Sequence, residues 1–121
     1  MTIAASELAT KAESLLKLQF AKLREPTKYI AAFRTTNGRH LALTRQNTND
    51  LYIWAELCPA SMDGVTVKNR DLPGQPYSET QPRSSNLNNA SKRLGIGNQV
   101  YYLKCDTLGA LERFITWYET K

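Results

Sequence analysis

The side chains best suited to binding chemistry lie in a polar segment between residues 58 and 99. Arg83, Ser84 and Ser85 stand where a short helix is expected to begin. Free backbone amides at a helix start, hydroxyls and a guanidinium all favour a phosphate, so these residues predict an anion site. An ordinary helix cap beside a solvated arginine is the competing interpretation. Further basic side chains of the same segment are Lys68, Arg70, Lys92 and Arg93.

A row of aromatic residues predicts a second kind of binding. The rings that fall on one face of the expected sheet are Tyr29, Phe33, Tyr52 and Trp54. Aromatic rings on a sheet with basic residues nearby hold single-stranded nucleic acid, and each stacked base contributes about 1–3 kcal/mol. We expect Tyr52 and Trp54 to stack bases in this way. In the alternative, a helix or the segment 69–99 covers this face, and the rings form a second core layer.

Residues with catalytic potential are few. His40 is the only histidine, and it can serve as a general base or simply fill a strand position. Cys58 and Cys105 lie 47 positions apart, and without a CxxC pair they cannot form a four-ligand zinc site with a single histidine. The acidic residues do not form the cluster that a metal-dependent nuclease needs. The sequence therefore predicts no metal and no other cofactor, and it favours binding over catalysis.

Length and charge limit the classes of protein to consider. A chain of 121 residues can bury enough surface to fold as one domain without disulfides or metal. Sixteen basic against eleven acidic residues give a net charge of +5, which favours polyanionic partners such as DNA or RNA. No apolar stretch is long enough to span a membrane, and the first residues do not resemble a secretory signal. We therefore expect a cytoplasmic protein without a membrane partner.

The first element expected is an amphipathic helix. Thr2 or Ser6 can cap its start, and Pro26 predicts its end near Glu25. The apolar residues that recur at helical spacing are Leu8, Ala12, Leu15, Leu16 and Leu23. Because the charges of this segment are balanced, we expect the apolar stripe to pack on the core rather than on a membrane surface.

A β-hairpin is expected around Asn37 and Gly38. The Asn-Gly pair lies between two runs of alternating apolar residues, which predicts a two-residue type I′ turn. The facing pairs in that register are Thr36 with Arg39, Thr35 with His40, Arg34 with Leu41, and Phe33 with Ala42. The core face would carry Ile30, Ala32, Leu41 and Leu43, joined by Leu51, Ile53, Ala55 and Leu57 from a third strand at 51–57.

Local patterns predict the remaining elements. We expect an edge strand at Val65–Lys68, a helix at 84–94 with Gly95 as its C-cap, and a strand at 100–105. A last helix would be capped by Asp106 or Thr107. Its apolar stripe consists of Leu108, Leu111, Ile115 and Tyr118. The predicted fold is α+β: an N-terminal helix, a three- to four-stranded antiparallel meander, a short helix in an irregular insertion at about 58–99, a final strand and a C-terminal helix.

Three functions are compatible with these patterns. The leading hypothesis is a small non-catalytic nucleic-acid-binding module, which contacts DNA or RNA phosphates through Lys68, Arg70, Arg83 and Arg93. The first alternative is a protein-interaction module, such as an inhibitor or adaptor of a phage or mobile element, because Tyr and Arg are also common at protein interfaces. The second alternative is a metal-free ribonuclease with His40 as its base. The oligomeric state is not predicted.

Overall fold

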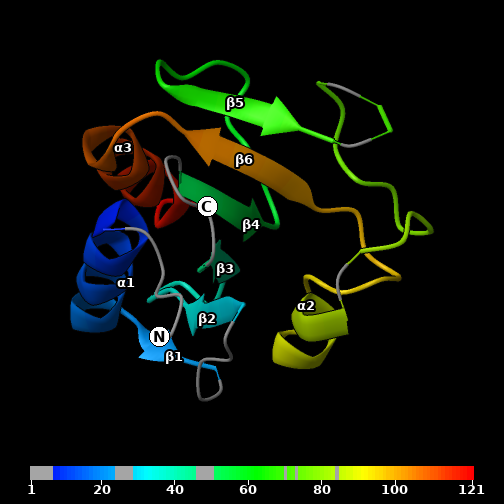
Figure 1. Cartoon of the computed structure of the whole chain (residues 1–121), viewed down its shortest axis with the longest axis horizontal. Helices are drawn as coiled ribbons and strands as arrows, with labels where there is room; N and C mark the ends of the chain where they lie inside the picture. The colour runs from blue at the N-terminus through cyan, green and yellow to red at the C-terminus, as the bar shows by residue number, and fades with distance from the viewer. Residues whose placement is uncertain (1–6, 24–28, 46–50, 70, 73, 84) are drawn as a thin grey trace.

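The computed structural model describes residues 7–23, 29–45, 51–69, 71–72, 74–83 and 85–121, and this part of the chain has an α+β fold (Figure 1). The elements in chain order are α1 (Glu7–Gln19), β1 (Ala21–Lys22), β2 (Ile30–Arg34), β3 (His40–Thr44), β4 (Leu51–Ala55), β5 (Val65–Lys68), α2 (Ser85–Ala90), β6 (Tyr101–Cys105) and α3 (Leu108–Tyr118). The described strands form one antiparallel sheet in the order β1-β2-β3-β4-β6-β5. The predicted class and its two terminal helices are confirmed, but the sheet has six described strands, whereas a three- to four-stranded meander and one final strand were expected.

The first face of the sheet is covered by α1 and α3 (Figure 1). Apolar side chains three and four positions apart on each helix point toward the strands, as the helical period requires. The buried residues that α1 contributes are Ala9, Ala12 and Leu16, and those from α3 are Ala110, Leu111, Phe114, Ile115 and Tyr118. Thr107 caps α3, because its hydroxyl accepts a hydrogen bond from the backbone N–H of Ala110. The predicted cap and stripe of the last helix are therefore confirmed.

The first helix is shorter than predicted. It ends at Gln19, and the chain continues as β1, which pairs with β2 at the edge of the sheet. Leu23 then belongs to the second face of the sheet, since its backbone N–H donates to the carbonyl of Ala32 and its side chain packs there. The expected caps at Thr2 and Ser6, and the stop at Pro26, lie outside the described residues.

The predicted type I′ turn is wrong. Gly38 has a φ of +86°, but no described residue other than glycine has a positive φ, so Asn37 does not adopt the conformation that a type I′ turn needs. The backbone N–H of Thr35 donates to the carbonyl of Arg39, and that of Gly38 donates to the carbonyl of Thr35. These bonds close a three-residue loop with glycine in the left-handed position, the next most common hairpin connection. The Asn37 side chain donates instead to the carbonyl of Tyr118 at the end of α3.

The longer loop shifts the register by one residue and inverts the predicted faces of β2. Phe33 pairs with Leu41, and Arg34 pairs with His40. Because successive side chains on a strand point to opposite faces, Ala31 and Phe33 lie in the core beneath the helices, whereas Ile30 and Ala32 lie on the second face. The residues correctly predicted for the core are Leu41, Leu43, Leu51, Ile53, Ala55 and Leu57.

The second face of the sheet carries its own apolar layer, partly covered by α2 (Figure 1). Trp54 is only 6% exposed and lies against Tyr77, with Leu87 and Leu94 from α2 and the turn after it. The residues that complete this layer from the sheet side are Ile30, Ala32, Ala42 and Val100. The aromatic face is therefore covered around Trp54, which agrees with the second-core-layer alternative for that residue.

The segment 58–99 supplies an edge strand and the cover of the second face. The predicted strand Val65–Lys68 is confirmed as β5, which pairs with β6 at the edge of the sheet. The predicted helix at 84–94 is too long, since α2 ends at Ala90 and a turn follows. Gly95 is not a left-handed C-cap, because its φ is not positive. A Cβ there would lie 3.1 Å from the Cα of Asn88, so glycine permits close packing of the turn on the helix.

Candidate functional site

Part of the second sheet face lies beyond the cover provided by α2. The register pairs Tyr52 with Lys104 and Trp54 with Tyr102 across β4 and β6, and it pairs Thr66 with Lys104 and Lys68 with Tyr102 across β6 and β5. Alternation along the strands places all six side chains on one face. Thr66 and Lys68 are exposed, whereas Tyr52, Tyr102 and Lys104 are half-buried. We call the residues Tyr52, Thr66, Lys68, Tyr102 and Lys104 the open face.

The aromatic rings of this region form a continuous stack that runs from the covered part to the open face. The rings of Trp54 and Tyr102 are nearly parallel, with centroids 4.3 Å apart, and those of Tyr102 and Tyr52 follow at 5.3 Å. Tyr77 meets Trp54 edge-on at 4.9 Å and closes the inner end. Such offset and edge-to-face contacts are favourable beyond the area they bury. The stack therefore fixes the orientation of Tyr52, its outermost ring.

The open face is positively charged. The strands β4, β5 and β6 together contain two lysines, Lys68 and Lys104, and no carboxylate. Lys104 lies in the row of Tyr52, and Lys68 lies in the row of Trp54 and Tyr102. Because positive charge on a low-dielectric surface raises the local concentration of anions, exposed Lys68 beside the stacked rings favours an anionic ligand.

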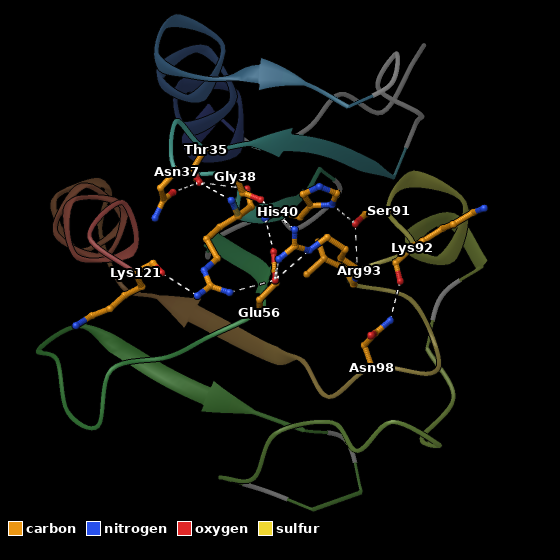
Figure 2. Close-up of polar contacts among 12 residues, drawn as sticks. Thr35, Asn37, Gly38, His40, Glu56, Ser91, Lys92, Arg93, Asn98 and Lys121 are labelled. Carbon is orange, nitrogen blue, oxygen red and sulfur yellow. Dashed lines mark hydrogen bonds and ion pairs between the residues drawn. The ribbon is translucent and has the colours of Figure 1, made fainter.

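A polar cluster around Glu56 lies at the end of the same face, beside the hairpin turn (Figure 2). One carboxylate oxygen of Glu56 accepts from Arg93 at 2.6 Å and lies 3.5 Å from Arg39, and the other accepts from the backbone N–H of His40. Arg93 also donates to the carbonyl of Gly38. Charge-assisted hydrogen bonds of this kind are stronger than neutral ones, and the Glu56 side chain is only 13% exposed. The cluster links the hairpin, the end of β4 and the turn after α2.

His40 takes part in this cluster through its ring. Its Nδ1 lies 2.7 Å from the hydroxyl oxygen of buried Ser91, which also accepts from the backbone N–H of Leu94. Burial, followed by the positive charge of Arg93, lowers the pKa of His40. The imidazole is therefore neutral at physiological pH, as a general base must be. Its Nδ1 holds the turn after α2, however, and both oxygens of the neighbouring carboxylate already accept hydrogen bonds.

Arg83 is committed to the backbone of its own segment. Its guanidinium donates to five backbone carbonyls, those of Ser78, Gln81, Leu94, Gly95 and Asn98. An arginine has five N–H donors, so all of them have acceptors here. The guanidinium also lies 5.8 Å from the centroid of the Tyr77 ring, and burial lowers its pKa. Arg83 thus joins the two halves of the segment that covers Trp54, and a phosphate would have to displace these carbonyls.

The structure separates the predicted site residues into two groups. Tyr52, Trp54 and Lys68 share the second sheet face, although Trp54 is buried. The residues on or next to α2 are Arg83, Ser85, Lys92 and Arg93, of which Ser85, Lys92 and Arg93 are exposed. Arg70 and Ser84 lie outside the described residues. The predicted anion site at the start of α2 therefore has one described hydroxyl and an arginine whose donors are in use.

Sequence reasoning missed Tyr102 and Lys104 as members of the site. The alternation within Tyr101–Cys105 does place these two side chains on one face. What the sequence does not reveal is that β6 lies between β4 and β5, because this order depends on contacts between distant parts of the chain. With that order known, Tyr102 falls between Trp54 and Lys68.

Other features of the described residues bear less directly on function. Within these residues, no group of three His, Cys, Asp or Glu side chains could hold a metal ion. Cys58 and Cys105 are free, and burial raises the pKa of Cys58 to about 11 and that of Cys105 to about 12, which disfavours the reactive thiolate. None of the described helices is long and apolar enough to cross a membrane. A cavity of about 330 Å³ lies between residues 58–62, β5 and Gly74.

Comparison of the chain with known proteins found no match. No protein-family model matches the chain, and neither a curated protein nor a solved structure matches it. Function is therefore inferred from the positions and contacts of the chain's own residues.

Proposed function

We propose that the protein is a small non-catalytic nucleic-acid-binding module whose main contact surface is the open face. The observation that carries this proposal is exposed Lys68 in the row of the stacked rings of Trp54 and Tyr102, next to Tyr52. Lysines supply the sequence-independent attraction to phosphates, and aromatic rings supply contacts to bases. The net charge of +5 adds long-range attraction.

The basic residues near α2 contribute unequally to this proposal. Lys92 is exposed, and the half-exposed side chain of Arg93 is oriented by Glu56, so both can add phosphate contacts at the end of the open face. Arg83 is left out, because its five donors bind backbone carbonyls. The surface proposed is therefore centred on β4, β6 and β5 rather than on the start of α2.

Salt titration tests the proposal. Two lysine–phosphate contacts predict that affinity falls roughly tenfold between 50 and 200 mM salt, because each neutralised phosphate releases counterions. Fluorescence anisotropy with labelled DNA and RNA oligonucleotides measures this dependence. Absence of binding to both, or an affinity that does not change with salt, would contradict the proposal.

A charge-matched pair of variants locates the surface. Lys68→Ala should weaken binding and reduce the salt slope by about one. Lys17→Ala removes the same charge from α1, on the opposite side of the sheet, where Lys17 pairs with Glu13 at 3.4 Å. We expect this control to leave the slope unchanged. Equal losses in both variants would mean that net charge, and not the open face, determines binding.

A protein-interaction module is the second candidate, and the position of β5 at the edge of the described sheet favours it. Gly64 accepts from the backbone N–H of Asp106, so by alternation the N–H and C=O of Val67 point away from β6. An extended peptide can pair with such an edge, and the neighbouring cavity can receive one of its side chains. Proline is tolerated at outward-facing edge positions, so Val67→Pro should abolish this pairing without breaking the bonds to β6. A protein captured from nuclease-treated lysate by the unaltered chain, but not by this variant, would support the second candidate.

A further inference from the structure

We propose that the open face selects single-stranded over duplex nucleic acid, with one base stacked on Tyr52. This inference rests on the proposed function and names its class of ligand. It follows from the direction of the aromatic stack, from the geometry of bases in a duplex, and from the positions of the two lysines relative to Tyr52.

The aromatic stack has one closed end and one open end. At the closed end Trp54 is buried and makes a T-shaped contact with Tyr77. At the open end one face of the Tyr52 ring is occupied by Tyr102, with an interplanar angle of 22°. The exposure of this half-buried residue is therefore left to the other face and the edge of its ring. A base placed there would extend the existing row of rings by one.

Only an unpaired base can occupy this position readily. In a duplex, both faces of each base are stacked on neighbours, and turning one base out costs a few kcal/mol. In a single strand the base faces are accessible, and stacking on an aromatic side chain contributes about 1–3 kcal/mol. A base of a single strand can therefore stack on the Tyr52 ring without the free-energy cost of leaving a duplex.

The lysines indicate where the phosphates would lie. Neighbouring strands are about 4.8 Å apart, so Lys104 stands one strand from Tyr52, and Lys68 stands one further strand away in the next row. Thr66, which pairs with Lys104 and lies on the edge strand β5, adds a hydroxyl group to this path. These positions predict a backbone that crosses the strands from β4 toward β5. The exposed charge of Lys68 on this path complements a polyanion.

The first experiment uses the unaltered protein. Its affinity for a labelled single strand is compared with its affinity for a hairpin duplex of the same base composition, in DNA and RNA forms, at fixed salt. We expect the single strand to bind at least about fivefold more tightly, which is the lower end of one stacked base. Equal or tighter binding of the duplex would overturn the inference and leave the proposed function intact. Absence of binding to both would overturn the proposed function itself.

The second experiment isolates the ring. Tyr52→Ala should raise the dissociation constant for the single strand by about 5- to 150-fold, equivalent to ~1–3 kcal/mol, and leave that for the duplex unchanged. Tyr52→Phe keeps the ring and should stay within about twofold of the unaltered protein, which also controls for loss of folding. Tyr29→Ala should have no effect, because the observed register places this 45% exposed tyrosine on the side of Ala31 and Phe33, opposite the open face. An unchanged affinity of Tyr52→Ala for the single strand would overturn the inference.

Discussion

The two ends of the second sheet face use basic side chains in opposite ways. At the covered end, Arg39 and Arg93 share the carboxylate of Glu56, and Arg83 binds five backbone carbonyls. On the open face, Lys68 is exposed beside the stacked aromatic rings. The same excess of positive charge is therefore structural at one end and suited to a ligand at the other. Whether a basic residue stabilises the fold or binds an anion depends on what surrounds its donors, and a count of charges in the sequence does not distinguish the two.

The largest expected effect tests the structural end through Arg83→Ala. The substitution removes the donor of the Gln81, Leu94 and Asn98 carbonyls, whereas those of Ser78 and Gly95 keep hydrogen bonds from the Gln81 N–H and the Asn98 side chain. We expect a loss of about 2–4 kcal/mol in the free energy of unfolding. Urea denaturation measures this loss, with Lys92→Ala as an exposed basic control in the same segment. Unchanged stability combined with lost nucleic-acid affinity would reverse the comparison and make Arg83 a ligand contact.

Removing the negative charge of Glu56 from the covered end should make the arginines there better able to bind an anion, as is proposed for the open face. Glu56→Gln leaves Arg39 and Arg93 with a neutral partner, and we expect stability to fall by about 1–2 kcal/mol. Binding of oligonucleotides at low salt should become tighter, because no carboxylate neutralises the charges of Arg39 and Arg93 any longer. Glu112→Gln, at an exposed position of α3, changes the net charge equally and should alter neither property. A similar gain in affinity from both variants would show that the location of the charge is unimportant.

Two threonines allow the same comparison for uncharged groups, because one buried hydroxyl has a hydrogen-bond partner and the other has none among the described residues. The buried hydroxyl of Thr44 has no hydrogen-bond partner in the described part of the chain, so Thr44→Val should raise the free energy of unfolding by about 1 kcal/mol. The hydroxyl of buried Thr35 accepts from the backbone N–H of Arg39 at 2.9 Å, so Thr35→Val should lower it by a similar amount. Chemical denaturation measures both variants. A loss of stability in Thr44→Val would indicate that its hydroxyl does have a partner.

The smallest expected effect concerns pH. The pKa of His40 is lowered below its ordinary 6.5 in the folded state, so the unfolded chain binds more protons below that pH. The contribution of His40 is therefore fully present above pH 6.5 and is lost as the pH falls through the folded-state pKa. Thermal unfolding between pH 7.5 and 5 should show a falling melting temperature, and His40→Gln should flatten the curve. A rise of stability on acidification would mean that Glu56 dominates over burial and Arg93.

Local signals in the sequence were sufficient for some elements. The cap at Thr107 and the apolar stripe of α3 depend only on neighbours within a few residues, and both were predicted correctly. The hairpin was placed correctly at Asn37 and Gly38, but its loop length was not. The side chain of Asn37 donates to the carbonyl of Tyr118, a contact across 81 positions that no local pattern contains. One extra loop residue was enough to exchange the two faces of β2.

The candidate site, like the fold, could be predicted only where local patterns in the sequence were sufficient. Tyr52, Trp54 and Lys68 were singled out from residue type and alternation, and the fold does place them on one face. Tyr102 and Lys104 were missed because the position of β6 in the sheet follows from long-range pairing. The role of Arg83 was hidden for the same reason, since five carbonyls converge on it only after the turns on both sides of α2 have formed.

The place of β6 in the sheet also determines when the proposed binding surface is completed. The hairpin of β2 and β3 and its extension to β4 join strands that follow one another in sequence, so these pairings can form early in synthesis. β5 is made next, yet its partner is β6, which begins more than thirty residues later at Tyr101. Until then β5 has no described strand to pair with, and Lys68 has no fixed position relative to Tyr52. In a nascent chain the proposed binding surface would therefore be complete only after β6 has been synthesised.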